Sequence, residues 1–127
     1  MPVVSDAQAV EVLAPILEKY IDCAEKHDID AQLQFLSVDA VFVLAGASCH
    51  HGHADIKKLL ETWYSQGKGE MHRSNKRITG SGSYIASLDD FTITYSDGKE
   101  VKGSNHQFWR EETDGTWLIF LQISTLS

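Results

Sequence analysis

The chain changes its hydrophobic period once, near Gly69. Before that glycine, apolar residues recur every three or four positions, as they do on one face of a helix. After it, they alternate with polar residues, as they do in a half-buried strand. Helices followed by a run of strands predict an α+β fold, in which three helices pack on a curved, mainly antiparallel sheet.

The three helices are expected in the first half of the chain. The first begins at the capping-box pattern of Ser5 and Gln8. Pro15 either kinks this helix or marks the start of its main body. Asp28 is the expected N-cap of a short second helix that continues through Leu36. The elements predicted next are a strand over residues 40–45, a loop over residues 46–52 and a third helix over residues 54–65.

Four strands are expected after the third helix, over residues 71–79, 84–95, 101–112 and 117–125. An Asp-Gly pair follows the second of these strands and another follows the third, and both are typical of hairpin turns. The apolar alternation of the second strand slips at Asp89 and Asp90, which predicts a β-bulge at that point.

The last strand, over residues 117–125, is apolar on both faces for most of its length. Strict alternation places two sets of apolar residues on opposite faces: Trp117, Ile119, Leu121 and Ile123 on one, Leu118 and Phe120 on the other. A strand of this kind is covered on both sides. We expect the helices to cover one side and a second copy of the chain to cover the other, which predicts a homodimer through the sheet face.

Length and composition predict a single domain over residues 1–127. The presence of only two cysteines predicts a cytoplasmic protein. A net charge of −7 disfavours binding to nucleic acid or to anionic membranes. No apolar run approaches the roughly 20 residues that span a bilayer, and no secretory signal pattern is present. Cys23 and Cys49 are expected to be reduced thiols, because two cysteines do not make a disulfide framework.

Three segments in this order resemble the nuclear transport factor 2-like superfamily, which includes ketosteroid isomerase, scytalone dehydratase and SnoaL-like cyclases. They are residues 18–46, 50–64 and 106–120. The resemblance implies a cystatin-like, cone-shaped α+β barrel with a cavity between its helices and its sheet. It does not imply one activity, because the superfamily contains isomerases, dehydratases, hydrolases and binding modules.

Within this resemblance, Tyr20 falls where ketosteroid isomerase has its oxyanion-hole tyrosine. Its hydroxyl could donate to a developing oxyanion, or it could be a core aromatic whose hydroxyl is satisfied inside the protein. Leu44 stands at the position of the catalytic Asp base of that enzyme. Because leucine cannot abstract a proton, we do not expect steroid isomerase chemistry by that mechanism.

The resemblance to scytalone dehydratase-like sequences suggests two histidines for the cavity. His72 would act there with Glu25 as its nearest supporting carboxylate, which would raise the pKa of the ring; alternatively, Glu25 is solvated. Ser104, His106 and Phe108 share one strand face, which resembles the face on which that enzyme holds its substrate. His106 replaces an asparagine there, and it could instead be bonded within the sheet.

Four potential metal ligands lie within five positions: Cys49, His50, His51 and His53. A zinc site typically adds a distant second pair of ligands, which this sequence lacks. We therefore expect a solvated loop over the mouth of the cavity and no metal ion. The alternative is that His51 or His53 reaches the ligand, where a histidine would titrate near neutral pH.

The stretch over residues 72–77 is locally basic. Strand alternation predicts that Arg73 and Arg77 point together, opposite His72. This pattern is typical of a solvated strand face, and the alternative is a rim for an anionic ligand.

The hypothesis for function is a homodimer that binds a small, mostly apolar organic ligand. Cofactor-free proton transfer such as dehydration, isomerisation or cyclisation would use Tyr20, His72 and His106. Other residues expected to contact the ligand are Glu25, Leu44, His53, Trp63, Ser104 and Phe108. The alternative is a non-catalytic binding or assembly module of the same fold.

Overall fold

The computed structural model describes residues 6–127, apart from the side chain of Ser81. Within this range the elements are α1 (Ala7–Glu25), α2 (Ile29–Leu33), β1 (Leu36–Leu44), β2 (Ser48–His51), α3 (Gly52–Tyr64), β3 (Glu70–Ser81), β4 (Tyr84–Thr94), β5 (Glu100–Glu111) and β6 (Trp117–Leu126). The strands form one sheet in the order β2-β1-β6-β5-β4-β3. Every neighbouring pair is antiparallel except β1 and β6. The predicted α+β class with three helices and a mainly antiparallel sheet is confirmed.

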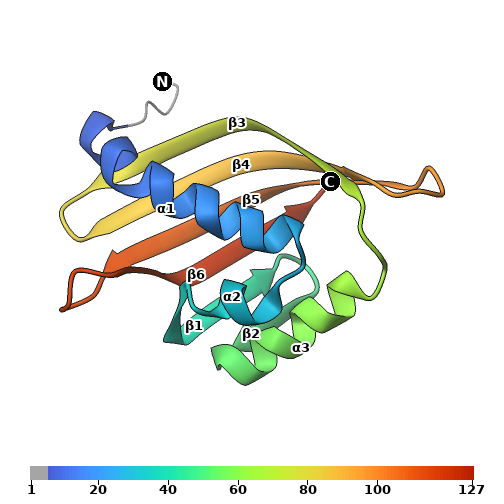
Figure 1. Cartoon of the computed structure of the whole chain (residues 1–127), viewed down its shortest axis with the longest axis horizontal. Helices are drawn as coiled ribbons and strands as arrows, with labels where there is room; N and C mark the ends of the chain where they lie inside the picture. Colours follow the sequence, from blue (N-terminus) through green and yellow to red (C-terminus); the bar gives the residue numbers. More distant parts are fainter. Residues whose placement is uncertain (1–5) are drawn as a thin grey trace.

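The helices cover one face of the sheet, which is called the inner face below. Helix α1 crosses the inner face of the long strands, and α2 and α3 lie beside β1 and β2 (Figure 1). The largest fully buried side chains belong to this layer and include Trp109, Phe42, Leu13 and Ile56. None of the helices in residues 6–127 is long and apolar enough to cross a membrane.

Local capping explains where the first two helices begin. The carboxylate of Asp6 accepts hydrogen bonds from the backbone N–H groups of Gln8 and Ala9, so Asp6 is the N-cap of α1. The predicted cap, Ser5, lies outside the described residues. Pro15 lies inside α1 and does not end it. Asp28 caps α2 by accepting from the backbone of Ala31, as predicted.

Residues 48–51 form the short strand β2, which is a correction to the predicted loop. This strand pairs antiparallel with β1 at the edge of the sheet. Its side chains are exposed or half-buried, so it lacks the apolar alternation that reveals a strand in the sequence. Helix α3 follows at once, with His51 as its N-cap and with Asp55 accepting from the backbone N–H of His51.

The β-bulge predicted at Asp89 and Asp90 lies instead on the facing strand. Strand β4 pairs with β5 without interruption, whereas the pairing of β3 with β4 shifts between Ser74 and Arg77. The sequence was misleading because the inward-facing row of β4 contains two buried polar residues, Ser87 and Asp89. The bulge also separates the two arginines that were predicted to point together, since Arg73 pairs with the inner residue Phe91 and Arg77 pairs with Leu88 on the outer face.

A second bulge, in β6, changes which residues of the last strand face inward. Phe108 pairs with Leu121 but Trp109 pairs with Ile119, so Phe120 is an extra residue. After this point Gln122 and Ser124 are buried, while Leu121 and Ile123 lie on the outer face. The predicted single face of Trp117, Ile119, Leu121 and Ile123 is therefore wrong beyond Ile119.

Candidate functional site

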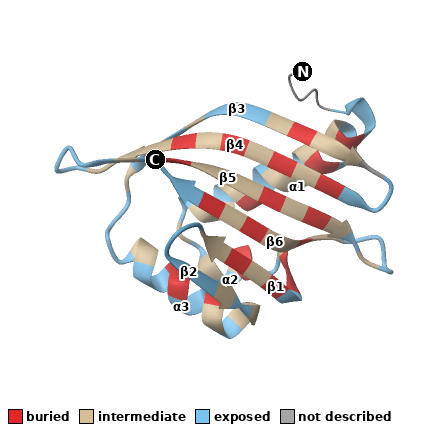
Figure 2. Cartoon of the chain, turned by 180° about the vertical axis from the view of Figure 1, so that it is seen from behind, coloured by how far each residue is buried: buried red, intermediate tan, exposed pale blue. Residues whose placement is uncertain are grey.

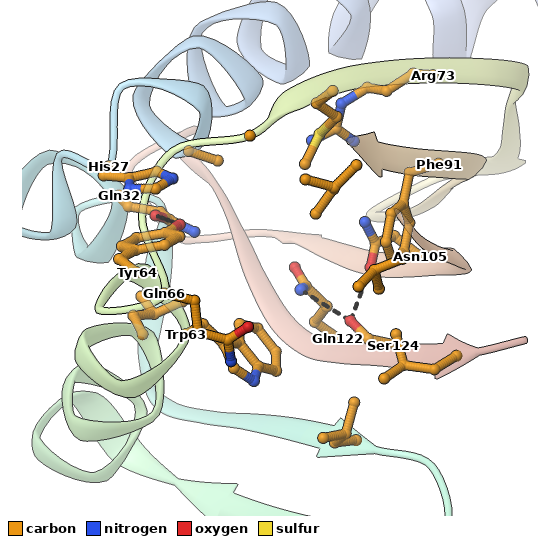
Figure 3. Close-up of a pocket in the computed structure, with 18 of the residues that line it drawn as sticks. His27, Gln32, Trp63, Tyr64, Gln66, Arg73, Phe91, Asn105, Gln122 and Ser124 are labelled. Carbon is orange, nitrogen blue, oxygen red and sulfur yellow. Dashed lines mark hydrogen bonds between the residues drawn. The ribbon is translucent and has the colours of Figure 1, made fainter. Parts of the chain in front are cut away.

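A cavity of about 340 Å³ lies between α1, α3 and the inner face of the sheet (Figure 3). Apolar and aromatic side chains from both layers line it, including Leu44, Leu60, Trp63, Met71, Phe91 and Ile93. A volume of this order suits a small organic ligand.

A chain of hydrogen bonds joins the helices to the sheet at this cavity. The Tyr64 hydroxyl donates to Oε1 of Gln32 at 2.6 Å, and Nε2 of Gln32 donates to the Tyr20 hydroxyl at 3.4 Å. Tyr20 in turn donates its only hydroxyl proton to Oε1 of Gln122 at 3.0 Å. Burial raises the pKa of Tyr64 to about 12 and raises the pKa of Tyr20 further. Both hydroxyls are therefore neutral at ordinary pH, and that of Tyr20 is satisfied within the protein.

Polar side chains continue across the inner face of β5 and β6. Gln122 accepts from Nε2 of Gln107 at 3.4 Å and donates to Oγ of Ser124 at 3.4 Å. Ser124 donates to Oδ1 of Asn105 at 2.7 Å (Figure 3). These four residues all line the cavity, so one wall is polar although the strands around it are largely apolar.

A buried ion pair stands at the end of the cavity wall formed by β3. The side chain of Arg73 is only 8% exposed, and its Nη1 donates to Oδ2 of the buried Asp89 at 2.6 Å. Oε1 of Glu25 lies 4.0 Å from the Nε of Arg73, on a side chain that is about half exposed. Nε of Arg73 and Oδ1 of Asp89 are buried and have no hydrogen-bond partner among the described residues. Arg73 lines the cavity, which the predicted solvated face did not anticipate.

A histidine also lines the cavity, where its ring stacks on an aromatic side chain of α3. The rings of His27 and Tyr64 are 3.9 Å apart and inclined by only 8°. Burial, with a smaller contribution from the positive charge of Lys68, lowers the pKa of His27 below its ordinary value. The ring is therefore harder to protonate than an ordinary histidine, and it adds an aromatic surface to the cavity.

The family follows from a match of the whole central part of the sequence. A model of the SnoaL-like domain matches residues 17–118, about four fifths of the chain. The chain belongs to the SnoaL-like domain family. No curated protein matches it.

Solved structures that are similar to this SnoaL-like domain have the same fold. A protein of unknown function with a cystatin-like fold from Nostoc punctiforme has a TM-score of 0.78 at 12% identity, covering 98% of this chain and 96% of that one. A ketosteroid isomerase-like protein from Erwinia carotovora atroseptica has a TM-score of 0.81 at 14% identity, covering 95% and 98%. A nuclear transport factor 2-like protein of unknown function from Pseudomonas putida has a TM-score of 0.81 at 13% identity, covering 95% and 88%. These similarities confirm the fold implied by the resemblance and carry no activity to this chain.

Three of the residues suggested by the sequence line the cavity of this SnoaL-like domain: Tyr20, Leu44 and Trp63. They come from α1, β1 and α3, which are far apart in the sequence and meet only in the folded chain. Their ligand contacts stay predictions.

The two predicted histidines do not share the cavity with Tyr20. His72 lies on the outer side of β3, is 68% exposed and has its Nε2 3.4 Å from Oε1 of Glu70. The prediction that Glu25 supports the ring of His72 is therefore corrected, because the carboxylate of Glu25 approaches Arg73 instead. His106 pairs with Ile123 on the outer face of the sheet, one position away from the inward-facing Gln107.

Ser104 and Phe108 share this outer face with His106, so the prediction that they line the cavity is also corrected. Ser104 donates to Oδ1 of Asp90 at 2.7 Å. Phe108 lines a separate, shallower hollow on the outside of the sheet. The expected sharing of one face was right, but strand alternation alone did not distinguish the inner face from the outer one.

The histidine-rich segment lies in β2 and the first turn of α3. His53 has its Nε2 2.9 Å from the backbone oxygen of Leu36, so it links α3 to β1 and does not line the cavity. His50 contacts Asp55 and Ser48 at 3.2 and 2.9 Å. Across residues 6–127, no three histidine, cysteine or acidic side chains are grouped closely enough to hold a metal ion.

Proposed function

We propose that the cavity of this SnoaL-like domain binds a small, mostly apolar organic ligand. The observation that carries the proposal is the combination of an open volume of about 340 Å³ with apolar rings and a polar wall. Small-molecule sites are usually built in this way, from a largely apolar pocket with a few polar groups that orient the ligand.

The proposal is for binding, not for proton transfer by the three groups that the sequence suggested. His72 and His106 lie on the outer side of the sheet, and the hydroxyl proton of Tyr20 is already donated to Gln122. A general acid or base must come within hydrogen-bond distance of the proton that it moves. The two histidines do not meet this condition for a ligand in the cavity.

Filling the cavity tests the proposal. We expect the neutral fluorescent probe N-phenylnaphthylamine to bind the intact protein with a stoichiometry of one per chain. Leu44→Trp places an indole in the cavity and is expected to weaken this binding by roughly tenfold or more, because well-packed apolar contacts contribute on the order of 25 cal/mol per Å². A fluorescence titration measures both.

Val43→Trp is the matched control. Val43 is the neighbouring residue on β1, does not line the cavity and pairs with Ile123 on the outer face. Its substitution should leave probe binding near the wild-type affinity, with folding of both variants checked by circular dichroism. Absence of wild-type binding, or equal effects of the two substitutions, would contradict the proposal.

We also propose that the outer face of the sheet pairs with a second copy of the chain. This face has a hollow of about 230 Å³ whose wall includes Tyr84, Phe108 and Phe120. Figure 2 shows this side of the sheet, where half-buried residues alternate with buried ones along the strands. Tyr84 is 59% exposed beside the hollow, so in a two-fold pair each copy would cover the aromatic patch of the other.

Light scattering tests this pairing. We expect a dimer at micromolar concentration and a monomer after Tyr84→Glu, because burying an unpaired carboxylate in an apolar interface is strongly unfavourable. Val12→Glu, at a 37% exposed apolar position on α1, should remain a dimer. A monomeric wild-type protein would show that the second copy does not cover this face.

A further inference from the structure

The charged residues that line the cavity are all of one sign. The chain has 18 Asp and Glu residues against 11 Lys and Arg, yet none of the lining residues in the described part of the chain is acidic. Arg73 and Lys99 are the cationic residues of the lining. The formal charge of the lining is therefore opposite in sign to the net charge of −7 of the chain.

The buried ion pair presents its cationic end to the cavity. Arg73 lines the cavity, whereas Asp89 does not, so the carboxylate stands behind the guanidinium as seen from the ligand space. Glu25 also approaches Arg73, but at 4.0 Å and on a half-exposed side chain whose charge is screened by water. The Arg73–Asp89 pair is buried, so its field is screened much less.

The guanidinium has hydrogen-bonding capacity that the protein does not use. An arginine carries five N–H groups, and within residues 6–127 only the bond from Nη1 to Asp89 is made. A buried polar group without a partner is unusual and calls for an explanation. Arg73 reaches the ligand space from β3, so a ligand acceptor is one such partner (Figure 3).

A second donor faces the same space from β5. Oδ1 of Asn105 accepts from Ser124, which leaves its amide N–H₂ without a partner among the residues described. Asn105 lies directly opposite Asp89 in the pairing of β4 with β5, and it lines the cavity. The guanidinium and this amide are both donors, so their natural counterpart is a group that only accepts hydrogen bonds.

From these contacts we infer that the ligand is an organic anion, with a carboxylate or sulfonate on an apolar, ring-sized body. The anionic group binds Arg73 and the amide of Asn105, and the body lies against the aromatic wall. This inference rests on the proposed ligand-binding function and names the class of its ligand. Asp89 acts here as a positioning residue, since it holds the guanidinium by a charge-assisted hydrogen bond without touching the ligand.

Two probes that share one apolar body separate this inference from the function on which it rests. Anilinonaphthalene sulfonate is N-phenylnaphthylamine with a sulfonate added. We expect the intact chain to bind the sulfonate roughly tenfold more tightly, the effect of about one charge-assisted hydrogen bond. Equal or weaker binding of the sulfonate overturns the inference and leaves the proposed function standing, whereas failure of both probes to bind overturns both.

Variants of the ion pair give a second readout, the ratio of the two affinities. Arg73→Met combined with Asp89→Leu removes both charges together and should lower the preference for the sulfonate roughly tenfold. Asp89→Asn removes the negative charge but keeps an amide oxygen that can accept from Arg73, so the guanidinium stays positioned and the preference for the sulfonate should rise. If the ion pair only stabilises the fold, the ratio of the two probe affinities should not change in either variant. That result overturns the inference.

Arg77→Met is the matched control, because Arg77 is on the same strand but on the other face of the sheet. The ratio of the two probe affinities in Arg77→Met should equal that of the wild type. Near-ultraviolet circular dichroism confirms that each variant is folded, so that probe fluorescence does not come from a loosened core. A ratio that falls as far in Arg77→Met as in the double variant overturns the assignment to Arg73.

Discussion

Arg73→Met alone is expected to lower the free energy of unfolding by about 3–5 kcal/mol, which is the usual cost of breaking a buried ion pair from one side. Methionine replaces most of the volume of the arginine side chain, so lost packing contributes little. The cost comes from Asp89, whose carboxylate would stay buried without its 2.6 Å partner. Urea unfolding followed by tryptophan fluorescence measures the difference.

Adding Asp89→Leu to this variant should restore most of the lost stability, because replacing both members of a buried ion pair by apolar residues is often neutral. The two effects are therefore strongly non-additive, as expected for residues in direct contact. Arg77→Met should cost far less, since Arg77 is on the outer face of the sheet and away from this pair. Additive losses in the double variant would mean that the charges of Arg73 and Asp89 are not coupled in the folded chain.

Trp109→Ala is expected to lower the free energy of unfolding by about 3–5 kcal/mol, through lost burial and the space left behind. Trp109 is completely buried on the inner face of β5. Its ring meets the ring of Tyr20 edge-on with centroids 5.9 Å apart, and its Nε1 donates to Oγ of Ser87 at 3.0 Å. The substitution therefore removes packing between α1 and the sheet, and it removes a buried hydrogen bond as well.

Trp117→Ala provides the comparison, because Trp117 is only partly buried at the start of β6. It should cost clearly less than Trp109→Ala in the same denaturation experiment. Equal losses would show that Trp109 is not a centre of the core. Since both changes are from Trp to Ala, the difference between them reports the environment and not the residue type.

Part of the cavity was predictable from the sequence. Tyr20 and Trp63 lie on the apolar stripes of their helices, and Leu44 lies near the end of a compact apolar strand. Apolar stripes turn towards the core because burial removes them from water, so residues on them are good candidates for a cavity wall.

The polar residues of the cavity were not predictable in the same way. Asn105 and Gln122 are amides in strands that contain larger and chemically more suggestive residues, such as His106. Alternation showed that neighbouring residues face opposite sides of the sheet, but it did not show which side the helices cover. One signal was available in the sequence. Asn105 and Gln107 lie two positions apart, so they share the strand face opposite His106 and form a second polar row.

By itself, the sequence determined the order of the elements, the class of the fold and most of the turns. These depend on neighbours within a few positions: helical or alternating periods, the cap at Asp28 and the Asp-Gly turns. Only the tertiary structure decided which side chains meet in the cavity. One bulge separates Arg73 from Arg77 and the other moves Gln122 to the inner face. Both arise from pairing with another strand, and a one-residue change of register reverses every side chain that follows. Arg73 can be buried because the carboxylate of Asp89, sixteen positions away, neutralises its charge. A pattern of neighbouring residues does not predict a contact between two residues so far apart in the sequence.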